Sequence, residues 1–516
     1  MTTILISKKY KYRIFIINLT IDDGTAVPKA IVIYLHEQSF SPHYKIFNLF
    51  LSIIYTFFFL SERLNYLLLE NKRYISYLKL PTTNLKTWKN ILSIISPRIE
   101  CLNINSIDVT FSLTCFSNLK SLIISCPYGF PDEELKLIFA SEQFESLHSF
   151  RILETEVGCG SNSHLYDYYP SQDYVFKKIF NKKNSLKTFE YLLKTSPLVI
   201  NDTNIFETNF NLYSLTLILK DFEDIYSLLS YTPNLEYLCL LSEPPYRRIR
   251  ISSSKISIKL KTLCLRLDCK ERTDDIRFWY EDIDLNQLTN FIKEFSSSLI
   301  CLSLDLIEIQ NKTNDFPLNH IKLKELLEIM VNLQKFHLRA YVADNKIDKN
   351  FILSKFNDPF WSDHNWSFGM NEYVFFTLPY QFDDFEGIYE AYNDMKSENP
   401  DILTNIPELW SSVKSISIPF QSKYDFNFLK ELQIKLPKLN KISLYNGYNY
   451  SDQLEHSYEE HNICLDTVTT VHLDWLTPTK IQDWLIFLLP NVKHLILDAD
   501  EETFPIEKRI NLNIEQ

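Results

Sequence analysis

The sequence predicts an α/β fold, an irregular solenoid of stacked helix–turn–strand units, and three observations support it. A short apolar motif, L-x-x-L-x-L with Ile, Val or Phe sometimes in place of Leu, recurs fourteen times along the 516 residues. Amphipathic segments that end at a proline precede several of these motifs. The chain has only seven scattered glycines, which excludes the glycine-rich phosphate loops of common nucleotide-dependent enzymes.

Each L-x-x-L-x-L motif predicts one short strand, because alternating apolar residues face one side of a sheet. The motifs begin at Ile75, Ile99, Leu119, Leu147, Leu186, Leu212, Leu235, Leu260, Leu299, Leu333, Val413, Leu439, Val468 and Val492. Most spacings between them fall within the roughly 20–29 residues typical of leucine-rich repeats. One unit cannot bury its leucines alone, so we expect the units to stack into a curved solenoid, with strands inside and helices outside.

Four segments before the motifs follow one pattern and predict the outer helices. Residues 84–97, 221–233, 425–437 and 478–490 each place apolar residues at helical spacing and end at a proline, which stops a helix. The asparagine or cysteine usual at the turn after the strand is missing, so we expect an irregular leucine-rich-repeat solenoid. Its place is taken by Pro127, Glu243, Asp268 and Gly447.

The segment before the first motif, IIYTFFFLSERLNYLLLENKRYISYLKL at residues 53–80, resembles the C-terminal half of an F-box. The whole chain is similar to F-box/leucine-rich-repeat proteins, in particular to a large set found in rotifers. In that family the N-terminal helices dock on the Skp adaptor of a cullin–RING (SCF-type) ubiquitin ligase, and the repeats select a protein substrate. The resemblance implies an N-terminal helical F-box-like cap.

The implied organisation has three parts. Residues 1–41 are unassigned, residues 42–74 form the F-box-like helical cap, and residues 75–516 form the repeat domain with an aromatic and acidic insertion at about 340–412. The adaptor-docking residues implied by the resemblance are Tyr55, Phe58, Phe59 and Leu60. A bare helical cap that covers the first strand is the alternative.

The apolar segment Ile46–Leu60 also raises a third reading, a membrane-tethered protein. It is shorter than the roughly 20 residues that a spanning helix needs. We therefore expect no membrane span and an intracellular protein, cytoplasmic or nuclear.

The insertion is dense in aromatic residues, and the rotifer family carries a similar block at this place. Its sequence YVFFTLPY predicts a hairpin, and aromatic side chains with polar groups are frequent anchors at interfaces. Trp361 and Trp366 are the candidate anchors. The alternative is that the aromatics pack a small core of the insertion itself.

Charge patterning suggests where a partner binds. The net charge of −12 does not favour binding to nucleic acid, yet we expect the strand face inside the solenoid to be locally positive and suited to an acidic protein. The candidate partner-binding residues on that face are Lys261, Gln334, His337, Lys414 and Lys441.

No catalytic, cofactor or metal site is predicted. GxSxG, HExxH and CxxC motifs are absent, and His456 and His461 are too far apart to share one helix face. Four of nine cysteines, Cys101, Cys239, Cys264 and Cys301, lie within motifs, and we expect them to be small buried thiols. The predicted function is a non-enzymatic substrate-recognition adaptor of a cullin–RING ligase. The alternative is a free-standing leucine-rich-repeat scaffold or receptor that binds a protein without docking to a ligase.

Overall fold

A computed structural model of the chain divides into two compact units, Met1–Tyr74 with Asp500–Gln516, and Ile75–Ala499. Each is considered by itself. The structure describes residues 2–4, 12–17, 30–35, 77–80, 92, 95–104, 113–126, 136, 138–154, 172–193, 197–200, 206–220, 222, 224–242, 258–267, 285–306, 320–341, 348–371, 374–386, 396–399, 409–419, 432, 434–445, 465–474, 491–492 and 494–498.

All fourteen motifs form strands, and each strand begins at the third residue of its motif. Ten of the strands precede the insertion: β4 Tyr77–Leu80, β5 Cys101–Ile104, β6 Ser121–Cys126, β7 Ser149–Glu154, β8 Thr188–Leu192, β9 Ser214–Leu219, β10 Tyr237–Ser242, β11 Thr262–Leu267, β12 Cys301–Leu306 and β13 Lys335–Tyr341. Four follow it: β18 Ser415–Pro419, β19 Lys441–Tyr445, β20 Thr470–Asp474 and β21 His494–Asp498. The predicted strand positions are therefore confirmed.

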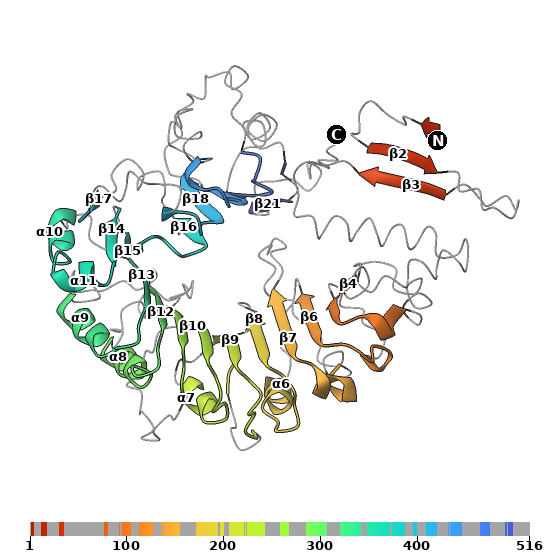
Figure 1. Cartoon of the computed structure of the whole chain (residues 1–516), viewed down its shortest axis with the longest axis horizontal. Coiled ribbons are helices and arrows are strands. Elements are labelled where there is room, and N and C mark those ends of the chain that lie inside the picture. The colour runs from red at the N-terminus through yellow and green to blue at the C-terminus, as the bar shows by residue number, and fades with distance from the viewer. Residues whose placement is uncertain are drawn as a thin grey trace, which may run out of the picture. The chain divides into compact units, whose positions relative to one another are not determined.

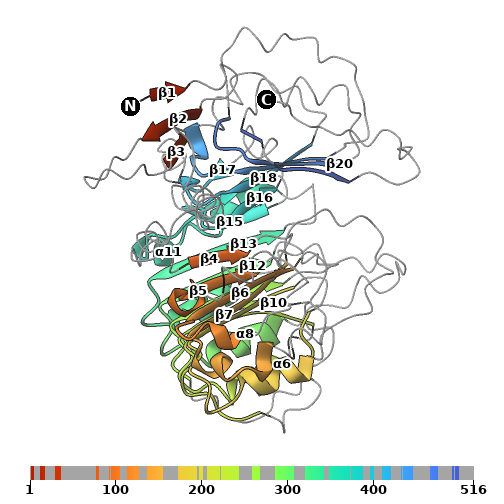
Figure 2. The same cartoon turned by 90° about the vertical axis from the view of Figure 1, so that its right-hand side faces the viewer.

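The strands pair in chain order. Strands β4 to β13 lie side by side in one sheet, each parallel to the next, and the same motif position pairs throughout, as in Leu238↔Leu263↔Leu302. Figure 1 shows these strands along the inside of an arc, and Figure 2 shows them stacked one above another. The second unit is thus an α/β structure with a large, mostly parallel sheet and short helices, as a repeat solenoid requires.

The core consists of the apolar motif positions. Leu238, Leu263, Ile416, Ile442 and Val471 are all buried, which confirms the predicted register for these five; the side chain of Leu495 lies outside the described residues. Since successive strand side chains point to opposite faces, the third and fifth motif positions lie on the other side. We call that side the inner face.

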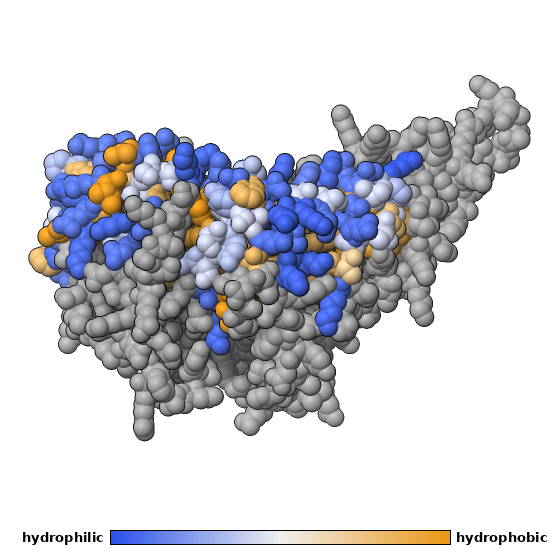
Figure 3. Space-filling view, turned by 90° about the horizontal axis from the view of Figure 1, so that it is seen from below, coloured by the Kyte–Doolittle hydropathy of each residue, from blue (hydrophilic) through white to orange (hydrophobic). Residues whose placement is uncertain are grey.

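Short helices connect the strands on the outer side of the arc (Figure 1). They are η1 Ser96–Arg98, η2 Leu113–Cys115, η3 Glu142–Ser146, α6 Gln172–Ile179, α7 Asp224–Leu229, α8 Leu285–Lys293 and α9 His320–Glu328. Helix α7 comes from the predicted segment 221–233 and buries Ile225, Leu228 and Leu229. The face seen in Figure 3, from below the arc, is largely hydrophilic over the described residues.

Side-chain amides link neighbouring units at the turn before five of the described strands. An asparagine directly before the first motif leucine donates to a backbone carbonyl of the preceding unit. The pairs are Asn118 to Pro97, Asn211 to Asn184, Asn234 to Phe210, Asn332 to Ser297 and Asn491 to Asp466. The asparagines missing after the strands thus have counterparts at the opposite strand end, where each donates to a backbone carbonyl.

The insertion extends the large sheet. It contains α10 Lys349–Ser354, α11 Pro359–Asp363, β14 Ser367–Met370, β15 Val374–Leu378 and β17 Lys396–Ser397. Strands β14 and β15 form the predicted hairpin, and β15 pairs antiparallel with β13. A Cβ at Gly369 would lie 2.6 Å from the Phe376 ring, so this close crossing needs glycine.

A second sheet follows. Strand β16, Asp384–Glu386, pairs parallel with β18, and the order β16-β18-β19-β20-β21 follows the chain. The repeat pattern therefore resumes after the insertion.

In the other unit, β1 Thr2–Ile4, β2 Tyr12–Ile17 and β3 Ala30–Leu35 form an antiparallel sheet within the residues that the sequence left unassigned. Residues 42–74, with the expected helical cap and its docking residues Tyr55, Phe58, Phe59 and Leu60, lie outside the described residues. Within the part of the chain that the structure describes, no helix is long and apolar enough to cross a membrane.

Candidate protein-binding surface

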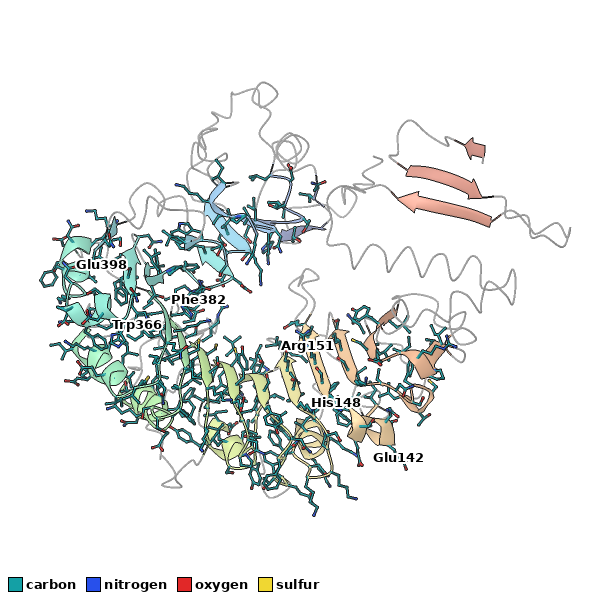
Figure 4. All side chains as sticks on the ribbon, viewed as in Figure 1. Glu142, His148, Arg151, Trp366, Phe382 and Glu398 are labelled. Carbon is teal, nitrogen blue, oxygen red and sulfur yellow. The ribbon has the colours of Figure 1, made fainter. Side chains whose placement is uncertain are left out.

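The inner face carries polar and thiol side chains in rows that cross the strands. The fifth motif position gives Glu190, Thr216, Cys239, Cys264, Ser303 and His337 on successive strands β8 to β13. The burial of β11 alternates between partly exposed and buried side chains, as the motif predicts. Figure 4 shows Arg151 on the inner side of the arc and Glu142 on the outer side.

Charges at the inner face and its edge are paired across neighbouring strands. The Lys261 ammonium lies 2.7 Å from a carboxylate oxygen of Glu236, and the Arg151 guanidinium lies 2.6 Å from Glu190. The predicted cation Lys261 is thus present and exposed, but its pair with Glu236 carries no net charge.

Two more predicted residues lie on or beside β13. Gln334 is exposed just before the strand, and His337 is partly buried on the inner face. Burial, with help from the charge of Lys335, lowers the pKa of His337 to about 4. At neutral pH this imidazole is uncharged and acts as a hydrogen-bonding group, not as a cation.

Lys414 and Lys441 belong to the second sheet, whereas Lys261, Gln334 and His337 belong to the large sheet and the turns before its strands. Lys414 precedes β18 and is exposed, and its ammonium lies 2.9 Å from Asp383. Lys441 begins β19 and pairs in register with Ser415.

The proposed role of Trp361 and Trp366 as surface anchors is wrong for this conformation, because their side chains are only 2% and 7% exposed. Trp361 packs edge-on against Phe368, and Trp366 packs against Phe336 of β13. The insertion's aromatics therefore form its own core, which was the alternative.

Exposed aromatic residues are found instead where β9 and β10 begin. Phe210, Tyr213 and Tyr237 are 58%, 43% and 37% exposed, and we call this group the aromatic edge. The backbone ties it together, since the Glu236 amide donates to the Tyr213 carbonyl. In the sequence, Tyr213 and Tyr237 stand at the second and third motif positions, outside the apolar pattern, and Phe210 precedes its motif by two residues.

A buried group of charges, the arginine network, joins the large sheet to the segment that starts the second sheet. Arg339 of β13 is 1% exposed, and its Nε donates to Oδ1 of Asp305 on β12 at 2.9 Å. Its Nη1 donates to the Tyr380 hydroxyl at 3.0 Å and to the Asp384 carboxylate at 2.9 Å. Arg266 of β11 lies 3.5 Å from Asp305.

The network keeps Arg339 and Asp384 charged. Burial opposes the charge of Arg339, but Tyr380, Asp305 and Asp384 raise its pKa above the ordinary value. Burial alone would raise the pKa of Asp384, yet the positive charges of Arg339 and Arg266 lower it. Arg266, Asp305 and Arg339 each lie one position beyond their motif. Tyr380 and Asp384 lie in the insertion, so the repeat pattern gave no sign of the network.

The motif cysteines are not the buried thiols that we expected. Cys101, Cys239, Cys264 and Cys301 occupy third or fifth motif positions and are partly exposed on the inner face. No group of three or more His, Cys, Asp or Glu side chains suited to a metal ion occurs among the described residues; His456 and His461 lie outside them.

Comparison with known proteins adds little. No protein-family model matches the chain, and neither does any curated protein. Among solved structures, the yeast complex of Rad7 and Elc1 overlaps with 80% of this chain and 91% of the other, at 12% identity and a TM-score of 0.32. Similarity at that level supports no statement about this protein's fold or function.

Proposed function

We propose that this protein is a non-enzymatic substrate-recognition adaptor of a cullin–RING ubiquitin ligase, which binds a protein through the inner face and the aromatic edge. Residues 42–74 would dock on the Skp adaptor. This part of the proposal rests on the resemblance of residues 53–80 to an F-box.

The observation that carries protein binding is the unbroken ladder of parallel strands from β4 to β13. Nine steps of about 4.8 Å between neighbouring strands give a surface roughly 43 Å long. That length suits a protein surface better than a small molecule, whose sites are enclosed pockets.

The aromatic edge supplies the second feature of a protein interface. Tyrosine and phenylalanine bury large areas at low entropic cost, and tyrosine is enriched among residues that dominate binding energy. The paired charges of Glu236 and Lys261 lie next to Tyr237 and would form the polar rim.

A pull-down of the purified Skp adaptor with the full chain tests the docking half. We expect capture by the wild-type chain and loss of capture when Tyr55, Phe58, Phe59 and Leu60 are all changed to alanine. Phe351→Ala is the matched control, because Phe351 is a large apolar residue that is 59% exposed in the repeat unit. Absence of capture by the wild-type chain would favour the free-standing scaffold.

A further inference from the structure

Two cysteines meet on the inner face in a way that no other described pair does. Cys239 of β10 and Cys264 of β11 are direct partners in the parallel register and occupy the same motif position. Their side chains therefore leave the sheet on the same side and at the same height. Both are free thiols and partly exposed.

The spacing suits a covalent link. Partners on adjacent parallel strands lie about 4.8 Å apart, within the Cα separation of about 4.4–6.8 Å that disulfides span. The strands line the inside of an arc (Figure 1), and the two thiols on its inner face are close enough to form a hydrogen bond with each other. Cys301 of β12 pairs with Thr262, not with Cys264, and is displaced by two residues along the strand.

We propose that Cys239 and Cys264 form a redox-active dithiol that a hydroperoxide oxidises reversibly to a disulfide across β10 and β11. The Cys239 thiolate attacks one oxygen of hydrogen peroxide, an S–O bond forms, the O–O bond breaks, and hydroxide leaves as water after protonation. The Cys264 sulfur then attacks the Cys239 sulfur, the S–O bond breaks, and a second water leaves. Two thiols thus lose two electrons and two protons, and one peroxide becomes two waters.

The order of the steps follows from the local contacts. A hydrogen bond from the Cys264 thiol lowers the pKa of Cys239 against the effect of burial, and Tyr237 contributes a further hydrogen bond. The same hydrogen bond to Cys239 raises the pKa of Cys264. Because the thiolate is the reactive form, Cys239 reacts first and Cys264 resolves the sulfenic acid.

The test treats the folded full-length chain with hydrogen peroxide, blocks remaining thiols by alkylation and maps linked peptides by mass spectrometry. We expect Cys239–Cys264 to be the dominant linkage, to disappear after dithiothreitol, and to be lost in Cys239→Ser and Cys264→Ser. Cys301→Ser, the matched control on the next strand, should retain it.

Linkages of Cys239 or Cys264 to Cys301 in the same amount as the Cys239–Cys264 linkage would overturn the proposal. So would a sample in which Cys101 and Cys115 are oxidised while Cys239 and Cys264 remain reduced. Phenylarsine oxide, which bridges two adjacent thiols, gives a second measurement that needs no oxidant. One equivalent should bind the wild-type chain and be lost in either serine variant; undiminished binding in both variants would also overturn the proposal. Mapping of the wild-type chain decides the question even if a variant does not fold.

Discussion

Replacement of Arg339 by methionine should strongly destabilise the junction between the large sheet and the segment that leads into the second. Methionine fills much of the same space but offers no donors. Asp305, whose side chain is 6% exposed, would lose two hydrogen bonds and keep, among the described residues, Arg266 at 3.5 Å. The Tyr380 hydroxyl would lose its donor, although it still donates to the Asp384 carbonyl at 2.7 Å.

The expected loss follows from the burial of the pair. Removing one partner of a buried ion pair costs about 3–5 kcal/mol, because the other charge is left without compensation. The remaining contact of Asp305 with Arg266 places this case near the lower end, about 3 kcal/mol. Arg151→Met is the matched control. That guanidinium is 37% exposed and its partner Glu190 21% exposed, so we expect a loss of no more than about 1 kcal/mol.

Urea unfolding followed by tryptophan fluorescence measures both variants. Trp361, Trp366 and Trp410 are buried in this part of the chain, and the ring of Trp410 lies 5.5 Å from that of Tyr380. Equal losses for the two variants, or a loss below about 1 kcal/mol for Arg339→Met, would refute the reasoning that burial makes this pair decisive.

The remaining predictions concern the core, pH and the partner surface. Leu263→Ala should cost about 2–5 kcal/mol, measured by urea unfolding, because it truncates a fully buried core position; a loss under about 1 kcal/mol would contradict the burial. Burial and the charge of Lys335 lower the pKa of His337 in the folded chain to about 4, below the ordinary value of about 6.5. As pH drops from about 6.5 to about 4, this imidazole therefore binds a proton in the unfolded chain but not in the folded one, and the free energy of unfolding should fall. His337→Gln should flatten that part of the profile, and an unchanged profile would argue against a neutral, buried imidazole. Lys414→Glu combined with Lys441→Glu should weaken partner capture without changing the melting temperature; unaltered capture would remove these lysines from the binding surface.

The repeat architecture could be predicted because one physical signal repeats along the whole chain. Each motif places apolar side chains at alternate positions, and only one register buries all of them, so Leu238, Leu263 and Ile416 fall into the core as expected. The hairpin of β14 and β15 was also predictable from its local sequence.

The candidate site was less predictable, because it depends on contacts between residues far apart in the chain. The Arg339–Asp305 pair joins residues 34 apart in sequence, and nothing local distinguishes these charges from solvated ones. Aromatic composition marked the insertion, but composition does not reveal whether Trp361 faces a partner or Phe368. The dithiol arises only when β10 and β11 are placed in register.

The central claim is that the chain connects a bound protein to a ubiquitin ligase. The most direct measurement is quantitative mass spectrometry of proteins that co-purify with the full chain, compared with the variant in which Tyr55, Phe58, Phe59 and Leu60 are alanine. We predict that a cullin and the Skp adaptor co-purify with the wild-type chain and are lost from the variant, while other partners, held by the repeat unit, remain with both. Partners that co-purify with the wild-type chain while cullin and the Skp adaptor are absent would contradict the ligase role and identify the protein as a free-standing scaffold.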